Sequence, residues 1–480
     1  MAIKQQAIKG VKWTSASTIG RAVIQLIQLS VVAHYLSAES IGLFALVQLS
    51  LTFCQLFSGF GIGHAIVQKQ TVSSRHVSEL FWVNLWLSFL LTAVIYFCAP
   101  LISLLFDQDS LQQHIEFVSV VFIITALSRI HLALLHKKLA FELVAKIELS
   151  SALIAFITVV VLVLQGFSIE ALLYGYLISA IIQSILFYAY SSFRPVIVRI
   201  HSWHEIRSYL SFGINQTGSS TINYFNSQFD IIIVGKLLGP EVLGGYSLAR
   251  QFCFRPAMVI NPVFTRVAFP IMSKLQGSTR LSRVYCQLTH LLALLNFPLY
   301  VALFVLAEPI VQLFFGAHWL AIVPTVKLMA CWCIVRSIIN PAGALLMAIG
   351  RVSLALKWNL FLLCVFPLAI YIGTFYGVYG VVLSMLIMQL LLLPLSWYFL
   401  LNQTVHISVL AFIKALISPA IMAIIAGVLA WITLQLSASY LYWQQLSLAI
   451  FIGVVSYCIM AYKTNVFFQN ICKGKISFEV

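Results

Sequence analysis

Arginines deep inside apolar stretches are the residues of this sequence best suited to chemistry. Arg21, Arg255 and Arg336 each lie far from either end of a long apolar run, and Arg250 shares the run of Arg255. A charge at a bilayer centre costs about 2.5–3.5 kcal/mol on insertion scales, so such a side chain normally faces a cavity or a partner. Because guanidinium holds phosphate in a planar fork, these residues predict an anion-binding cavity. Snorkelling and pairing with acidic residues are the structural alternative.

The charge count indicates a surplus of cations in the apolar runs. Of 28 Lys and Arg residues, twenty fall in short connecting segments and eight remain in or beside the runs. Snorkelling explains Lys236, which is close to a helix end, whereas for Arg129, Arg266 and Lys327 snorkelling and a cavity role have similar weight. Acidic residues in these runs are few, and they include Asp230, Glu142 and Glu148. They are too few to neutralise every cation, which points to a visiting anion.

Two helices, expected near 9–36 and 208–236, carry stripes of polar residues. Steps of three or four residues keep each stripe on one helix face. The stripes include Arg21, Gln25 and Gln28 in the first helix and Asn223, Asn226 and Asp230 in the second. Their amides offer donors and acceptors to sugar hydroxyls, and hydrogen bonds to other helices are an equal alternative. Asp230 is also a candidate site for a coupling proton or sodium ion.

The stripes belong to an internal repeat. Leu36, Glu39 and Gly42 recur 202 residues later as Leu238, Glu241 and Gly244, with similar residues between them. An even number of apolar runs separates the copies, so both should run in the same direction, related by an axis along the membrane normal. A duplicated bundle with polar faces turned inward is typical of secondary transporters.

The run that follows the second stripe contains Pro256 and Pro262. Proline removes an amide donor and clashes with the preceding turn, so this helix should bend. We therefore consider both prolines hinge candidates, with a static kink as the alternative.

Composition places the chain among polytopic membrane proteins. It is 61% hydrophobic and 9% charged over 480 residues, whereas soluble proteins average ~25% charged residues. A span needs ~20 apolar residues, and we count about fourteen such runs. We predict an all-α membrane protein with two six-helix lobes related by a pseudo-twofold axis, followed by two further helices. The expected divisions are an N-terminal lobe at 1–192, a linker at 193–207, a C-terminal lobe at 208–401, and two peripheral helices with a tail at 402–480.

The connecting segments indicate the orientation and limit the function classes. Cations gather in alternate connections, which predicts that both termini are cytoplasmic. Their dispersal also explains the net charge of +15 without nucleic acid. Connections this short leave no room for a soluble catalytic domain, and no Gly-rich phosphate loop follows a strand. Cys331 and Cys333 face apart on a helix, so we expect no metal site there. We also expect no cofactor, and the short connections predict that the protein is not an enzyme.

Two blocks resemble bacterial polysaccharide exporters of the multidrug/oligosaccharidyl-lipid/polysaccharide superfamily. The first is Gly239-Pro-Glu-Val-Leu-Gly-Gly-Tyr-Ser-Leu-Ala-Arg250, continued over 260–276. The second, which includes Asn340-Pro-Ala-Gly-Ala-Leu-Leu-Met-Ala-Ile-Gly-Arg351, is similar to the colanic-acid exporter (WzxC-type) branch. The resemblance covers roughly 5–400. It implies two six-helix lobes around a cationic cavity, and flipping of undecaprenyl-pyrophosphate-linked oligosaccharides across the bacterial inner membrane.

The expected function is therefore export of such a precursor for exopolysaccharide, capsule or O-antigen synthesis, by alternating access between the lobes. Its partners would be the lipid-linked oligosaccharide, the bilayer and other polysaccharide assembly proteins. The alternatives are a lipid II flippase or a multidrug cation antiporter. An antiporter for cations should carry acids in its N-terminal lobe, where this chain has Arg21. A membrane glycan polymerase or acyltransferase is a further alternative, disfavoured by the short loops.

Overall fold

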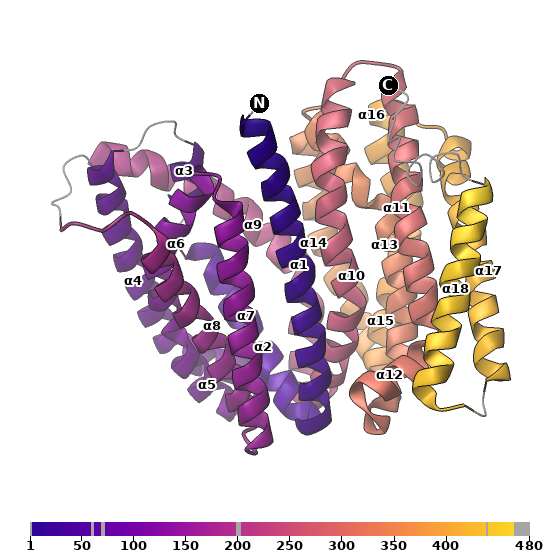
Figure 1. Cartoon of the computed structure of the whole chain (residues 1–480), viewed down its shortest axis with the longest axis horizontal. Helices are drawn as coiled ribbons and strands as arrows, with labels where there is room; N and C mark the ends of the chain where they lie inside the picture. The colour runs from indigo at the N-terminus through magenta and orange to yellow at the C-terminus, as the bar shows by residue number, and fades with distance from the viewer. Residues whose placement is uncertain (1, 59–61, 69–72, 198–202, 438–439, 465–480) are drawn as a thin grey trace. The chain divides into compact units, whose positions relative to one another are not determined.

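A computed structural model of the chain describes residues 2–58, 62–68, 73–197, 203–437 and 440–464. Within these residues every regular element is a helix, which confirms the predicted all-α class (Figure 1). The chain forms two compact units, unit 1 at 1–247 and unit 2 at 248–480. The predicted lobe limits remain a prediction, and residues 198–202 of the expected linker lie outside the described residues.

Unit 1 contains nine helices in its described residues and the start of a tenth. These are α1 (Ala2–Tyr35), α2 (Ala38–Phe57), α3 (Ile62–Gln68), α4 (Ser74–Phe106), α5 (Asp109–Ser119), α6 (Val121–Lys137), α7 (Phe141–Leu164), α8 (Ile169–Tyr190), α9 (Trp203–Leu237) and the first turns of α10 (Gly239–Lys274).

Unit 2 begins inside α10. It continues through α11 (Arg280–Val305), α12 (Ala307–Phe315), the 3₁₀ helix η1 (Ala317–Ile322), α13 (Val323–Ala348), α14 (Val352–Thr374), α15 (Gly377–Ser396), the π-helix η2 (Trp397–Asn402), α16 (Gln403–Val405), α17 (Val409–Leu436) and α18 (Tyr442–Thr464).

Twelve helical stretches of the described chain are long and apolar enough to cross a membrane. Two further helices, α9 and α10, are 35 and 36 residues long but carry the second polar stripe and several arginines. The prediction of about fourteen spans is therefore confirmed as an approximate count. The chain is a multi-pass membrane protein.

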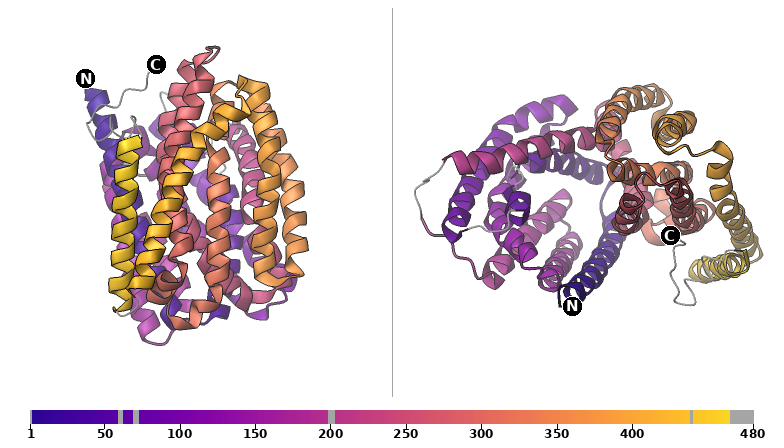
Figure 2. Two further views of the ribbon diagram at one scale, coloured as in Figure 1. Left: turned by 90° about the vertical axis from the view of Figure 1, so that its right-hand side faces the viewer. Right: turned by 90° about the horizontal axis from the view of Figure 1, so that it is seen from above.

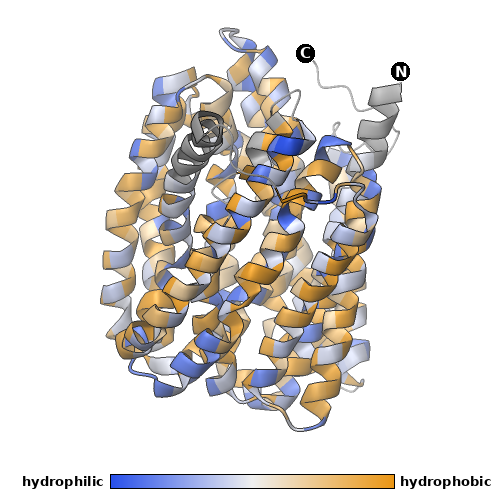
Figure 3. Ribbon diagram, turned by 90° about the vertical axis from the view of Figure 1, so that its left-hand side faces the viewer, coloured by the Kyte–Doolittle hydropathy of each residue, from blue (hydrophilic) through white to orange (hydrophobic). Residues whose placement is uncertain are grey.

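Outward-facing side chains fit a lipid environment. On α4, Leu90, Phe97 and Leu101 are 61%, 77% and 64% exposed. Exposing such large apolar side chains is unfavourable in water and favourable against lipid tails. Figure 3 shows apolar residues over much of the helix surface in that view, with hydrophilic residues frequent near the helix ends. Serine caps help to set several helix starts: the Ser37 hydroxyl accepts from the Ser40 amide at the start of α2.

Helix α1 packs along α7 in unit 1. Small residues permit this approach, because a Cβ on Gly20 would lie 2.9 Å from a methyl carbon of Leu149. Helix α9 packs instead on α2. The Tyr224 hydroxyl donates to the Leu49 carbonyl oxygen at 2.7 Å, which is buried and fixes the register of the two helices.

The two copies of the repeat meet at a reciprocal backbone contact within unit 1. A Cβ on Gly42 would lie 1.8 Å from the Pro240 carbonyl oxygen, and one on Gly244 would lie 1.8 Å from the Ala38 carbonyl oxygen. Ala38 and Pro240, like Gly42 and Gly244, occupy equivalent positions 202 residues apart. In this contact the glycine of each copy meets a backbone carbonyl oxygen of the other copy, which is the pattern that a twofold relation produces.

The core of unit 2 surrounds α11. Helices α13 and α17 both pack on it, and α18 packs on α17, as Figures 1 and 2 show. The Tyr457 hydroxyl of α18 donates to the Leu294 carbonyl oxygen of α11 at 2.8 Å, and Phe297 and Met422 belong to the same buried cluster. The two C-terminal helices are thus attached to the bundle by a specific hydrogen bond as well as by apolar packing.

Candidate functional site

Helices α10 and α13 together build a cluster of arginines and aromatic rings in unit 2. Arg250 and Phe254 are four residues apart on α10, and Trp332 and Arg336 are four residues apart on α13. Residues at this spacing occupy the same helix face, so each helix presents one cation beside one ring. We call these four residues the arginine–aromatic cluster.

The two rings of the cluster stack on each other, and each lies beside a cation, with Arg336 close to both. Phe254 and Trp332 lie with centroids 5.3 Å apart and planes inclined by 19°. The Arg250 guanidinium lies 4.9 Å from the centre of the Phe254 ring, and that of Arg336 lies 4.7 Å from a Trp332 ring centre. Stacking uses the face of a guanidinium group and directs its N–H groups sideways, where they can donate to an anion.

A cavity of about 230 Å³ opens beside the cluster. Its walls come from α10, α11 and α13, and they include Phe254, Asn261, Tyr300, Trp332, Arg336 and Asn340. The cavity therefore combines ring faces, a cation and neutral polar groups.

Three buried polar atoms of the cavity lining lack a nitrogen or oxygen partner within the described residues. They are the Trp332 indole nitrogen, the Tyr300 hydroxyl and the Asn261 side-chain oxygen. Buried polar groups are nearly always hydrogen-bonded, so such atoms require an explanation. They offer a donor, a hydroxyl and an acceptor to a molecule in the cavity, and water or a hydroxyl-bearing ligand could form the corresponding hydrogen bonds. Sugar rings, which bind through hydroxyls and stack on aromatic faces, match this lining.

The structure brings two of the four predicted cavity arginines, Arg250 and Arg336, to this cluster. Arg255 is partly buried on α10 and donates to the Gln251 side-chain oxygen at 3.3 Å, outside the cavity lining. Pro262 lines the cavity, whereas Pro256 does not, and α10 remains helical through both. Their role as hinges remains a prediction.

Arg21 belongs to unit 1 and has an acidic partner there. Its guanidinium lies 3.2 Å from the Glu148 carboxylate of α7, with the two side chains 36% and 25% exposed. An anion arriving at Arg21 would therefore compete with Glu148. Gln25 is exposed and Gln28 half-buried on the same helix.

On α9, Asn223 is exposed, Asn226 is half-buried and Asp230 is buried. The Tyr246 hydroxyl donates to the Asp230 carboxylate at 2.6 Å. This contact gives the buried carboxyl a hydrogen-bond donor, and the role of Asp230 as a coupling site remains a prediction. Within the described residues, no group of three or more His, Cys, Asp or Glu side chains is placed to hold a metal ion.

Two more of the eight cations in or beside the apolar runs, Lys236 and Arg129, have partners in unit 1. Lys236, which the sequence suggested as a snorkelling residue, lies 2.5 Å from the Asp107 carboxylate. Arg129 donates to the Ser58 carbonyl oxygen. Both contacts favour a structural role for these two residues.

Sequence reasoning missed the aromatic and neutral part of the cavity. Phe254, Trp332, Tyr300 and Asn261 are ordinary residues in apolar helices, and none was a candidate. One signal was available: an aromatic residue four positions from each of two deep arginines, on the same face of its helix.

Comparison with known proteins agrees with this description. The family described as polysaccharide biosynthesis protein matches residues 31–324. Lipopolysaccharide biosynthesis protein WzxC of Escherichia coli (strain K12) is 30% identical, over 87% of this chain and 86% of that protein. Teichuronic acid biosynthesis protein TuaB of Bacillus subtilis (strain 168) is 28% identical over 99% of both chains.

The fold is also similar to a solved structure. Lipid II flippase MurJ in an inward closed conformation superposes with a TM-score of 0.74, at 16% identity, over 96% of this chain and 100% of that chain. At this identity the likeness shows the fold alone. The resemblance predicted from two blocks of sequence is confirmed: with more than half of its length matched by the family and a relative at 30% identity, this chain belongs to the polysaccharide biosynthesis protein family.

Proposed function

We propose that this protein flips a polyprenyl-pyrophosphate-linked oligosaccharide across the bacterial inner membrane for polysaccharide synthesis. The observation that carries the proposal is the cavity beside the arginine–aromatic cluster. Its lining combines the Arg336 guanidinium, aromatic rings and buried polar atoms that lack a nitrogen or oxygen partner within the described residues. Pyrophosphate or an acidic sugar suits the cations, and neutral sugars suit the rings and polar atoms. Relatives named for lipopolysaccharide and teichuronic acid biosynthesis support a glycan substrate.

The transport cycle proposed here follows from the repeat. Lobes at 1–192 and 208–401 would alternate access to the substrate, while the lipid tail stays in the bilayer and both termini stay cytoplasmic. Arg21, Arg255, Gln25, Gln28, Asn223 and Asn226 would meet the substrate during this cycle. A cationic drug is a poor substrate for the cavity, because the Arg336 guanidinium lines it and Arg250 lies against the adjoining Phe254 ring.

Substitutions at Arg336 test the proposal. In a host whose export depends on this protein, Arg336→Ala should reduce glycan export per unit of membrane protein. Losing a charge-assisted contact costs about 1.5–3 kcal/mol, and because Arg336 is exposed we expect the lower end, an about tenfold weaker apparent affinity. Arg336→Lys should restore export only partly, since ammonium lacks the fork. Arg283→Ala removes an exposed arginine of α11 outside the cavity and serves as the control.

Flipping by the purified protein in vesicles separates the rival substrates. The expected substrate is a polyprenyl-pyrophosphate oligosaccharide, with lipid II flipped poorly. Equal flipping of lipid II, or export by Arg336→Ala at the level of the parent, would contradict the proposal.

A further inference from the structure

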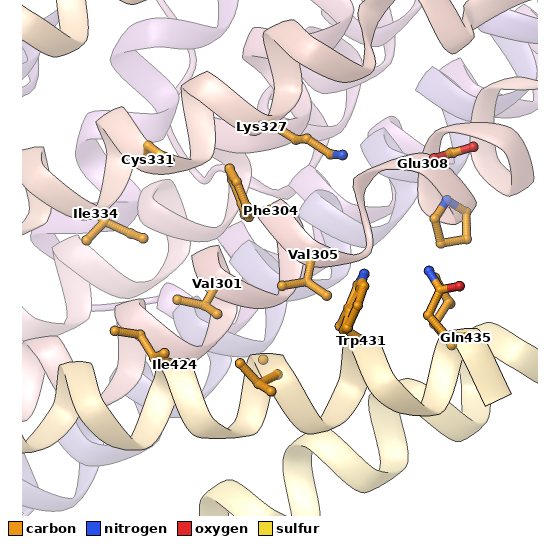
Figure 4. A pocket seen from close by; sticks show the side chains of 14 residues that line it. Val301, Phe304, Val305, Glu308, Lys327, Cys331, Ile334, Ile424, Trp431 and Gln435 are labelled. Carbon is orange, nitrogen blue, oxygen red and sulfur yellow. The ribbon is translucent and has the colours of Figure 1, made fainter. Parts of the chain in front are cut away.

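A second cavity in unit 2 lies between the bundle and α17, away from the arginine–aromatic cluster. Its volume is about 500 Å³, and helices α11, α12, α13 and α17 line it. None of its lining residues belongs to the cavity beside the cluster. We call it the α17 groove (Figure 4).

One end of the α17 groove gathers polar side-chain tips. Figure 4 shows the Lys327 ammonium, the Glu308 carboxylate, the Trp431 indole nitrogen and the Gln435 amide directed toward the same gap. Within the described part of the chain, neither Lys327 nor Glu308 has an ion-pair partner. The groove thus offers one positive and one negative group at the same end.

The rest of the groove is apolar. Val301, Val305 and Ile334 line it on the bundle side, and Ile424 and Val428 line it on α17. Gly427 brings the helices together at this place, because a Cβ there would lie 2.5 Å from a methyl carbon of Val301. A slot with charges at one end and hydrocarbon along its length matches an amphiphile rather than a soluble ligand.

We propose that the α17 groove binds one membrane phospholipid with a zwitterionic, primary-ammonium headgroup of the phosphatidylethanolamine type. Lys327 pairs with the phosphate, Glu308 accepts from the ammonium, and an acyl chain lies along Val301, Ile424 and Val428. The two opposite charges select this occupant, because an anionic lipid or a polyprenyl pyrophosphate would bring no cation to the Glu308 carboxylate. Trp431 and Gln435 complete the headgroup end with an indole N–H and an amide, as expected at a membrane interface.

Lipids retained by the purified full-length protein test the proposal. The protein is extracted in a mild detergent, exchanged into mixed phosphatidylethanolamine and phosphatidylglycerol, and its bound lipids are counted by mass spectrometry. Glu308→Gln should lower the retained ratio of phosphatidylethanolamine to phosphatidylglycerol about two- to fivefold, the range of a partly exposed charge contact. Lys327→Gln should lower retention of both lipids. The control Lys414→Gln removes an exposed charge from α17 outside the groove and should change neither.

Quenching of Trp431 by lipids brominated on their acyl chains provides a second measurement of lipid binding in the groove. The parent and Trp431→Phe are compared, and their difference isolates the groove signal. We expect brominated phosphatidylethanolamine to quench this signal at lower mole fraction than brominated phosphatidylglycerol, and Glu308→Gln to remove the preference. Equal quenching by both lipids, or retention ratios in Glu308→Gln that match the parent, would overturn the proposal.

Discussion

The reciprocal contact of Gly42 and Gly244 predicts that alanine at either position destabilises the protein. A Cβ on Gly42 would lie 1.8 Å from the Pro240 carbonyl oxygen and 2.6 Å from its carbon. Real Cβ contacts below 3.0 Å are essentially absent, so the backbones must separate by more than 1 Å. Both obstructing atoms are main chain, and no rotamer change can relieve the clash.

The magnitude follows from overpacking. Extra methyl groups in a well-packed interior cost about 1–3 kcal/mol, and a backbone clash belongs at the upper end. For a unit of this size each kcal/mol lowers the unfolding midpoint by ~2–4 °C, so Gly42→Ala or Gly244→Ala should lower it by several degrees. Because either methyl group separates the same two segments, the double variant should lose less than the sum of the single losses.

Heat unfolding of the purified protein in detergent, followed by tryptophan fluorescence, measures this effect. Gly63→Ala is the matched control, since a Cβ there meets its nearest neighbour at an ordinary 3.7 Å. Its midpoint should stay at or above that of the parent, because alanine favours a helix. If Gly42→Ala and Gly244→Ala unfold at the midpoint of the parent, or if their losses add fully, the reciprocal contact is not what holds the repeats together.

Two further predictions concern charge. Arg21→Gln should reduce glycan export, both alone and combined with Glu148→Gln, whereas Glu148→Gln alone should export near the parent level. If export recovers in the double variant, the pair is purely structural. The pair itself should contribute about 0.2–1 kcal/mol to stability in a double-mutant cycle, because both side chains are partly exposed. Reporter fusions after Lys475 and at Asp107 should report opposite compartments, and a shared compartment would refute cytoplasmic termini.

The fold could be predicted from the sequence because its causes are local. Long apolar runs with short connections leave helices as the available way to satisfy the backbone in lipid. The repeat of Gly42 at Gly244 was also visible in the sequence. Its physical reason was not, since only the folded chain brings each glycine against the carbonyl oxygen of the other copy.

The site was predicted only in part because contacts between helices depend on their rotation and register. The pairing of Arg21 with Glu148 and the pairing of Lys236 with Asp107 each join residues more than a hundred positions apart. Periodicity assigns a residue to a helix face and says nothing of the helix opposite. For the same reason the stacking of Phe254 on Trp332 could not be inferred, although both adjacent arginines were singled out.

Comparison of the two repeat copies separates scaffold from chemistry. Both copies keep the glycine that permits the close approach, Gly42 in α2 and Gly244 in α10. Six and ten residues further along, α10 has Arg250 and Phe254 where α2 has Gln48 and Thr52. The backbone contact is therefore duplicated while the cation and the ring are not. A duplicated scaffold whose copies carry different side chains beyond the shared contact suits the proposed substrate, an amphiphile with chemically different ends.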